Sequence, residues 1–318
     1  MSSRTFEQFI RFTTDSVGLE RTFRLLQAIA QIFSSYPALL GLFVSFLELI
    51  SIDAAPSYSA AHGILLVLRR RLGLARRFFR LFRFLDSFHA AQKLYANIAV
   101  QQLPSGKKRP SWVYLEAYLD VLGRTFNGMY LLLESSTIVD ALQIDGLAAW
   151  GPGRERTVGV EAQRFWLFAL VCAVASGALK ALQVLAYTPV PPAGDVTQSE
   201  KVADAREKEK EKTAPAAAGG DGEEEEEEFD VRKEQERLRG LVRQARKRRV
   251  LWRREVRAKL RGLGRTTAAN ALDIVLPGVI VGWIDADPGI VGVVMFITTV
   301  LTGLDVWERC GREVSEGK

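Results

Sequence analysis

Cysteine and histidine are almost absent from this sequence, which has two of each among 318 residues. Two cysteines are too few for the disulfide framework of a small secreted domain. Two histidines leave little from which to build a histidine-based metal site. The sequence also lacks a Walker loop, a Rossmann fingerprint and any metal-spaced cysteine or histidine cluster. We therefore expect a protein that is not an enzyme and that needs no metal or other cofactor.

An uncharged apolar run is missing from the first 20 residues, where Arg4, Glu7, Arg11 and Asp15 interrupt the phenylalanines. A secretory signal peptide needs such a run, so we expect none here. The chain as a whole is nevertheless rich in apolar residues, which make up 48% of it. That share excludes a mainly disordered chain and provides ample material for a core.

Charge is unevenly distributed along the chain. The 43 basic and 37 acidic residues give a formal net charge of +6, but residues 1–187, 188–230, 231–265 and 266–318 carry net charges of +7, −9, +12 and −4. The acidic block has almost no large apolar residue and contains six consecutive glutamates, so burial cannot offset its ordering entropy. We expect residues 188–230 to form a disordered linker, with an acidic docking arm as the functional alternative.

Two later segments are long and apolar enough to suggest membrane spans. The first, residues 161–187, has 15 uncharged residues at 165–179 before Lys180, whose long side chain can reach the interface from near a helix end. Small residues recur at every fourth position and would form a smooth helix face that permits close approach of another helix: Ala169, Ala173, Gly177 and Ala181. A buried core helix is the alternative.

The second candidate span lies within residues 266–308. Its first apolar stretch, residues 274–284, has 11 residues and is too short to cross alone, whereas residues 289–304 are 16 uncharged residues. The polar turn at 285–288 leaves two arrangements open: a helical hairpin, or one span preceded by a shallow segment, which we favour. A pair of glycines in GxxxG spacing also indicates helix packing here: Gly278 and Gly282.

Residues 68–85 carry the most specific pattern in the chain. At about 100° per residue, most of their arginines fall within an arc of roughly 140°, and large apolar side chains fill most of the rest. The cationic face has no acidic residue for i,i+4 pairing, which a solvated helix usually supplies. A core helix with a solvated arginine face is the alternative, but we expect this helix to lie on anionic lipid and to wedge one leaflet. The membrane-binding residues would be Arg69, Arg70, Leu72, Arg76, Arg77, Phe78, Phe79, Arg80, Phe82 and Arg83.

Basic residues precede both candidate spans. Those of residues 231–265 could contact nucleic-acid phosphates, but no recognised nucleic-acid module accompanies them and a span follows closely. Electrostatic attraction to the membrane surface is the simpler account, so we expect no nucleic-acid partner. Arg154, Arg156 and Arg164 precede the first span and would place the N-terminal region in the cytosol.

The rest of the sequence has helical periodicity and no strand signal, so the chain is predicted to be all-α. Three further helices are expected at residues 14–35, 37–52 and 111–144. Thr14 or Asp15 would cap the first, and Gly123 or Gly128 would break the third. The predicted parts are an amphipathic helical region at 1–160, a span at 161–187, the linker at 188–230, a basic helix at 231–265, an apolar membrane segment at 266–308 and a tail at 309–318.

Three groups of residues occur in a characteristic order along the chain. They are Thr13-Thr14-Asp15 with Glu20-Arg21 and Arg24-Leu25-Leu26-Gln27, then residues 72–94, then Asn270-Ala271-Leu272-Asp273 with Leu276-Pro277 and Gly282-Trp283. In order, spacing and hydropathy they resemble the peroxisomal biogenesis factor 11 family, whose amphipathic membrane-remodelling helix would correspond to the second group. The resemblance covers most of residues 10–185 and 265–308, and the charged insert at 188–265 departs from the compact members.

That resemblance implies an integral protein of the peroxisomal membrane that elongates the membrane before fission. It also implies self-association and help in recruiting division factors. Family members have been associated with metabolite passage, so a pore for small metabolites is one alternative function. An adaptor whose charged arm recruits division factors is another.

Overall fold

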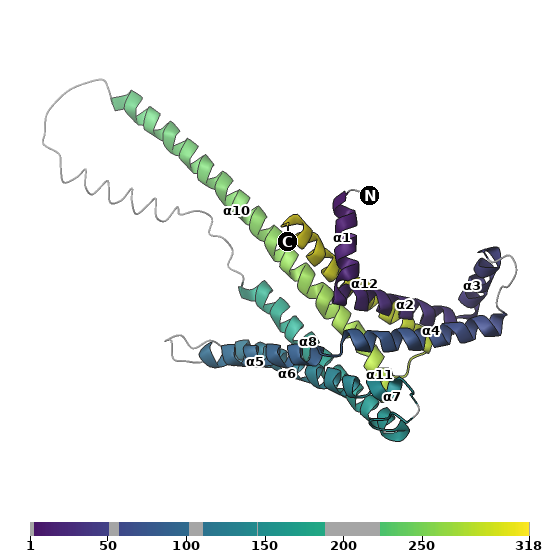
Figure 1. Cartoon of the computed structure of the whole chain (residues 1–318). Helices are drawn as coiled ribbons and strands as arrows, with labels where there is room; N and C mark the ends of the chain where they lie inside the picture. The colour runs from purple at the N-terminus through teal and green to yellow at the C-terminus, as the bar shows by residue number, and fades with distance from the viewer. Residues whose placement is uncertain (1–2, 51–56, 102–110, 145, 188–222, 318) are drawn as a thin grey trace. The chain divides into compact units, whose positions relative to one another are not determined.

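The computed structural model describes residues 3–50, 57–101, 111–144, 146–187 and 223–317. Within these ranges every regular element longer than a turn is a helix and none is a strand, which confirms the all-α prediction (Figure 1). The chain divides into two units, Met1–Ala181 with Leu263–Lys318, and Leu182–Gly262. The contacts between helices described below lie within the first unit.

Three helices form the N-terminal part: α1 (Ser3–Thr14), α2 (Ser16–Ser35) and α3 (Pro37–Ile50). The predicted helix start near Asp15 is confirmed, because the carboxylate of Asp15 accepts a hydrogen bond from the backbone N–H of Gly18 at 3.2 Å. Such a side-chain acceptor satisfies one of the amides left free at a helix N-terminus.

The predicted single helix over residues 68–85 is wrong, because the chain turns between α4 (Tyr58–Phe79) and α5 (Arg83–Gln101). The backbone N–H of Arg80 bonds to the carbonyl of Arg77, three residues back, at 3.1 Å. The carbonyl of Leu81, which is free of the helical ladder at this turn, accepts a hydrogen bond from the Ser135 hydroxyl at 2.9 Å. A partner from a distant helix therefore stabilises a break that the local periodicity does not reveal.

The middle of the chain forms α6 (Ser111–Ser136), α7 (Ile138–Ala141) and α8 (Pro152–Tyr187). Gly123 or Gly128 was predicted to break α6, but the helix continues through both positions. Both glycines instead allow other helices to pack closely against α6. A Cβ built at Gly123 would lie 3.4 Å from the Cβ of Cys172, and one built at Gly128 would lie 2.7 Å from the Phe88 ring.

The C-terminal part forms α10 (Glu223–Asp273), α11 (Val275–Val281) and α12 (Pro288–Ser315). The predicted basic helix lies within α10, but α10 begins at Glu223, so the last residues assigned to the linker are helical; residues 188–222 lie outside the described ranges. The predicted polar turn at 285–288 is confirmed up to Asp287, which caps α12 through the N–H of Gly289 at 3.2 Å.

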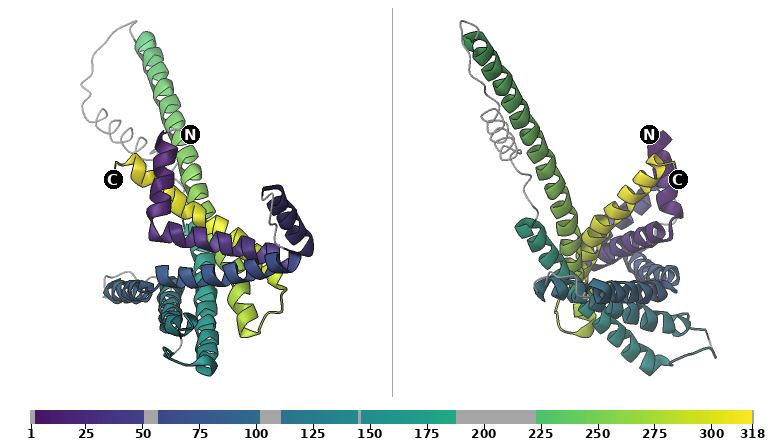
Figure 2. Two further views of the ribbon diagram at one scale, coloured as in Figure 1. Left: turned by 45° about the vertical axis from the view of Figure 1, so that its right-hand side comes forward. Right: turned by 90° about the vertical axis from the view of Figure 1, so that its left-hand side faces the viewer.

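The core is built around α2, which packs against α4 and α12 (Figure 2). Ala30 packs with buried residues of α3 and α4, among them Leu40 and Leu65. Ala28, almost opposite Ala30 on the helix, packs with Met295 of α12 and with a residue of α11. Alanines on both faces let α2 lie close to both neighbours.

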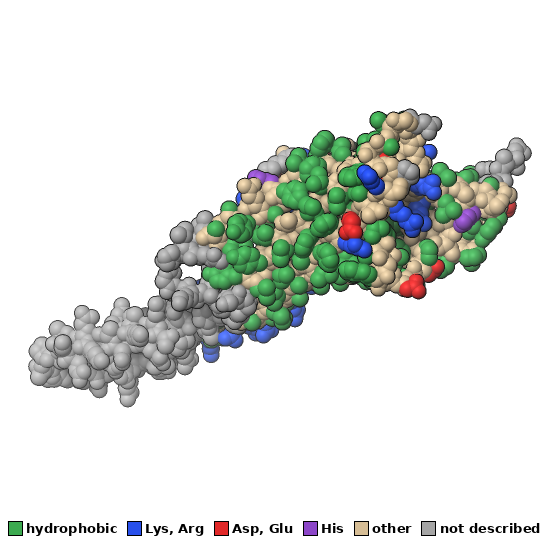
Figure 3. Space-filling view, turned by 90° about the horizontal axis from the view of Figure 1, so that it is seen from below, with side chains coloured by type: hydrophobic (Ala, Val, Ile, Leu, Met, Phe, Trp, Pro, Cys, Tyr) green, Lys and Arg blue, Asp and Glu red, His purple; other side chains and the backbone are tan. Residues whose placement is uncertain are grey.

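Among the described residues, two helices are long and apolar enough to cross a membrane, over Gly153–Ala186 and Pro288–Ser315. The first contains residues 161–186 of the first predicted span, and the second contains residues 289–304, the longer apolar stretch of the second. In the C-terminal segment, α11 has seven residues, fewer than the about 20 that a span needs, and a turn separates it from α12. Figure 3 shows hydrophobic side chains covering much of one face of the molecule, as expected where lipid replaces water.

Candidate functional site: the arginines of α4 and their partners

Arg76 of α4 is directed into the protein and not toward the surface. Its Nε and Nη2 atoms donate to one carboxylate oxygen of Glu20 at 2.9 and 2.8 Å, and its Nη1 donates to the amide oxygen of Gln27 at 2.7 Å. Glu20 is 2% exposed and lies on α2. Because one rigid guanidinium binds both Glu20 and Gln27 of α2, these hydrogen bonds fix the rotation of α4 relative to α2.

Arg80, in the turn after α4, is bound in the same way to α6. It donates to Glu134 at 2.9 Å and to the hydroxyl of Tyr130 at 3.0 Å, and Tyr130 donates to the same Glu134 oxygen. Burial alone would lower the pKa of Arg80, but the Glu134 carboxylate raises it, so the guanidinium stays charged. Burial, reinforced by Glu134, raises the pKa of Tyr130 to about 12, so the phenol remains a donor.

A third buried arginine joins α2 to the C-terminal helices. Arg24 donates to Asp273 at 2.5 Å, at the end of α10, and to the hydroxyl of Thr298 in α12 at 3.1 Å. We call Glu20, Arg24, Arg76, Asp273 and their contacts the α2 ion-pair network. A buried charge that loses its partner is costly, so this network specifies which helix faces meet.

The acidic members of these pairs were not among the predicted site residues. Glu20, Glu134 and Asp273 lie 56, 54 and 249 positions from the arginines that they bind. One signal was available: each is a single carboxylate set among apolar helical residues, a position where charged side chains are rarely buried unless paired.

The apolar side chains of α4 divide into two sets. Leu72 is buried, and the Phe79 ring lies 5.3 Å from that of Phe23 on α2. Other apolar residues are exposed, four of them within an arc of about 100° on α4, with a fifth in the turn. We call this set the exposed stripe: Ile64, Val67, Leu68, Phe78 and Phe82.

The predicted membrane-binding arginines are correspondingly divided. Arg70 is exposed, as is Arg71, which did not fit the predicted arginine arc, whereas Arg69 and Arg83 are half-buried. Arg77 is half-buried as well, with its guanidinium 3.5 Å from the hydroxyl of Thr137. The structure thus places the exposed stripe and two exposed arginines, Arg70 and Arg71, at the surface of α4.

The predicted small-residue face of α8 lies against two helices of the first unit. Ala169 is buried, and its carbonyl lies 3.5 Å from a Cβ built at Gly123 of α6. A Cβ built at Gly177 would clash with Thr267 of α10. Ala173 lies next to Gly123, and Ala181 is half-buried one turn beyond Gly177.

The predicted glycine pair has a local role. A Cβ at Gly278 would lie 2.5 Å from the Ile284 side chain, and nothing lies within 4 Å of one at Gly282. Gly282 ends α11 in the left-handed conformation, with φ of 84°. These two glycines therefore shape the turn between α11 and α12 and do not bring two long helices together.

Comparison with known proteins gives one family. The sequence model of the family described as Peroxisomal biogenesis factor 11 matches residues 43–307, which cover most of the chain. No curated protein and no solved structure matches. The matched range contains α4 to α11, including the exposed stripe and Arg76 and Arg80.

Proposed function

Because the chain belongs to the peroxisomal biogenesis factor 11 family, we propose that it elongates the peroxisomal membrane before fission by inserting the exposed stripe of α4 into one leaflet. The family has a role in peroxisome biogenesis and is associated with the peroxisomal membrane. The helices α8 and α12 supply the anchor in this proposal, since both are long and apolar enough to span.

The observation that carries the proposal is the exposed stripe itself. Phe82 is 70% exposed, which is unusual for a phenylalanine of a soluble domain. Burying such side chains at the boundary between headgroups and acyl chains is favourable, and the volume inserted into one leaflet promotes curvature. Arg70 and Arg71 beside the stripe can reach anionic headgroups.

The buried ion pairs explain how the stripe is held. Arg76 binds α4 to α2, and Arg80 binds the following turn to α6, so the wedge belongs to a packed unit of helices. Because the exposed stripe is fixed to a rigid unit, the force of its insertion into lipid reaches the anchored helices α8 and α12. This differs from a free amphipathic helix that folds on the lipid surface.

Orientation and partners belong to the same proposal. Arg154, Arg156 and Arg164 near the start of α8 favour a cytosolic N-terminal region. Self-association would bring several inserted stripes together, and a cytosolic surface would be accessible to division factors.

The orientation of the N-terminal region is tested by protease treatment of isolated peroxisomes that carry an N-terminally tagged copy. Protection of the tag without detergent would contradict a cytosolic N-terminal region.

The test replaces two residues of the exposed stripe in the full-length protein: Phe78→Glu with Phe82→Glu. Each phenylalanine removed from lipid costs about 1.5–3 kcal/mol of membrane binding, so we expect loss of tubulation of vesicles that contain phosphatidylserine, and shorter peroxisomes in cells. The matched control is Val250→Glu with Leu251→Glu, two exposed apolar residues of α10. Wild-type tubulation by the stripe variant, or equal loss in the control, would contradict the proposal.

A further inference from the structure

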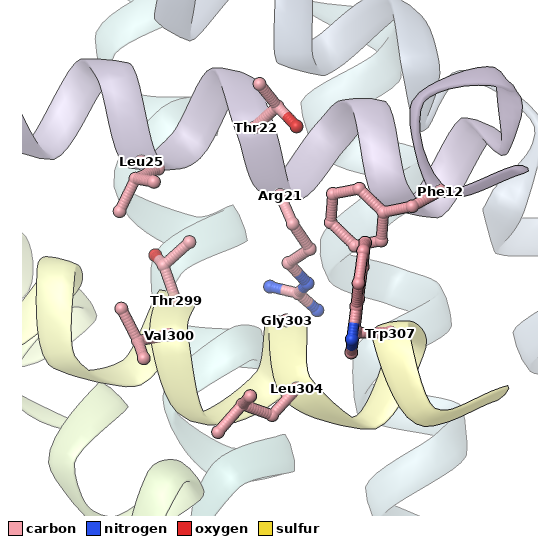
Figure 4. A pocket seen from close by; sticks show the side chains of 9 residues that line it. All are labelled: Phe12, Arg21, Thr22, Leu25, Thr299, Val300, Gly303, Leu304 and Trp307. Atoms are coloured by element: carbon pink, nitrogen blue, oxygen red, sulfur yellow. The ribbon is translucent and has the colours of Figure 1, made fainter. Parts of the chain in front are cut away.

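A groove lies between α2 and α12, at a place that the proposed function does not use. Its volume is about 210 Å³, larger than the roughly 150 Å³ apolar cavity that takes up benzene. Figure 4 shows its lining, which comes mainly from these two helices. The lining residues are Phe12, Arg21, Thr22, Leu25, Thr299, Val300, Gly303, Leu304 and Trp307.

Most of this lining is apolar, and its hydroxyl groups are satisfied within their own helices. Thr22 donates to the carbonyl of Gly18 at 3.0 Å, and Thr299 donates to that of Met295 at 2.5 Å. The rings of Phe12 and Trp307 meet edge to face at 5.7 Å and close one end. The other polar groups of the lining are the indole N–H of Trp307 and the guanidinium of Arg21, which extends from α2 toward Gly303 (Figure 4). The guanidinium is the charged one.

The buried guanidinium of Arg21 lacks some of the hydrogen-bond acceptors and counter-charge that burial normally requires. Its side chain is 23% exposed, and among the described residues its buried Nε has no hydrogen-bond acceptor. The closest carboxylate oxygen, on Glu20, is 3.6 Å from Nε, beyond hydrogen-bonding distance. Glu20 already receives two hydrogen bonds from Arg76 through its other oxygen.

The charges around Arg21 do not balance. In the described part of the chain, the α2 ion-pair network and Arg21 contribute three guanidinium groups, from Arg21, Arg24 and Arg76. They contribute two carboxylates, from Glu20 and Asp273. One positive charge is therefore in excess, and it lies beside the groove. Buried charges normally have a counter-charge, so an anion at Arg21 would complete the pairing.

We propose that this groove binds an anionic amphiphile, an acyl chain that ends in a carboxylate or a phosphate. The acyl chain lies along Leu25, Val300 and Leu304, and the anionic group accepts hydrogen bonds from Arg21. Gly303 has no side chain to occupy the groove, and the space beside it is open, since a Cβ built there meets nothing within 4 Å. An apolar groove with one orienting charge is the usual form of a lipid or fatty-acid site.

The experiment uses full-length protein in phosphatidylcholine nanodiscs and a diazirine-labelled palmitic acid. After irradiation, mass spectrometry locates and quantifies the label on peptides of α2 and α12. Unlabelled palmitic acid, phosphatidic acid and palmityl alcohol serve as competitors. Label is expected near Arg21 and near Val300–Trp307, displaced by an anionic competitor and not by the alcohol.

Two variants test the two parts of the site separately. Arg21→Gln removes the charge, and Gly303→Leu fills the groove without an initial clash. Each should reduce labelling about tenfold or more, the effect of losing a charge-assisted contact or the space for the chain. Their matched controls are Arg156→Gln, at an exposed arginine, and Gly159→Leu, where a Cβ also meets nothing within 4 Å. Both controls should label like the wild type.

The competitors identify the source of the anion. Displacement by palmitic acid indicates a free fatty acid, and displacement by phosphatidic acid indicates a membrane lipid; both support the site. Equal displacement by the alcohol, wild-type labelling of Arg21→Gln or Gly303→Leu, or label spread evenly over α8 and α12 would overturn it. Because the exposed stripe is unchanged in these variants, failure here leaves the proposed wedge intact.

Discussion

The helix α4 and the middle of α10, residues 243–257, are both rich in arginine, yet they use it in opposite ways. Arg76 of α4 and Arg80 after it are 12% and 14% exposed and are bound to carboxylates of other helices. In α10, Arg246, Arg248 and Arg249 are exposed, and the pair Lys259–Glu255 is 61% and 67% exposed.

The comparison shows that an arginine-rich face does not by itself identify lipid as its partner. In α4 the acidic partners come from α2 and α6, so the absence of local i,i+4 partners was misleading. In α10 the exposed residues Arg246, Arg248 and Arg249 remain available to an external anion, whereas Arg265 near its end is paired with Asp305 and Glu308 of α12. The proposed lipid-binding surface of α4 therefore rests on its exposed apolar residues more than on its arginines.

The strongest test of this difference is Glu20→Gln. It leaves Arg76 and Arg21 buried without a full counter-charge, and breaking a buried pair costs about 3–5 kcal/mol. The thermal unfolding midpoint of the purified protein in detergent should fall sharply. The control Glu255→Gln breaks the exposed pair of α10 and should cost less than about 1 kcal/mol. Equal shifts in both variants would show that the two helices do not differ as described.

A second test addresses α10 and lipid. Changing Arg246, Arg248 and Arg249 to Gln should weaken the binding of nanodisc-embedded protein to phosphatidylserine vesicles by about 1 kcal/mol per arginine. High salt should remove the difference, since exposed charges are screened. The unfolding midpoint should stay unchanged. Unaltered vesicle binding at low salt would mean that the basic stretch of α10 does not act on lipid.

The smallest effect is expected for Arg80→Lys. Lysine keeps the charge but cannot bind Glu134 and Tyr130 with one planar fork, so about 1–2 kcal/mol of stability should be lost. Arg253→Lys in α10 is the control, because Arg253 is exposed. The same unfolding measurement applies, and an undisturbed midpoint for Arg80→Lys would show that its geometry is unimportant.

Much of the fold could be predicted because its signals are local. Asp15 can cap α2 and Asp287 can start α12, since a side chain reaches amides two or three residues away. The apolar stretches within α8 and α12 are visible as composition. The break at residues 80–82 could not be predicted, because Ser135 and Glu134, which stabilise it, lie more than 50 positions away.

The sequence by itself determined the helical class, the two apolar helices long enough to span and the segregation of charge, since each depends on neighbouring residues. The tertiary structure alone decided which arginines are paired, which phenylalanines are exposed and where Arg21 meets a groove. These depend on contacts between residues far apart in the chain. A buried guanidinium must find its carboxylate wherever the packed helices present one, and periodicity within one helix carries no information about that partner.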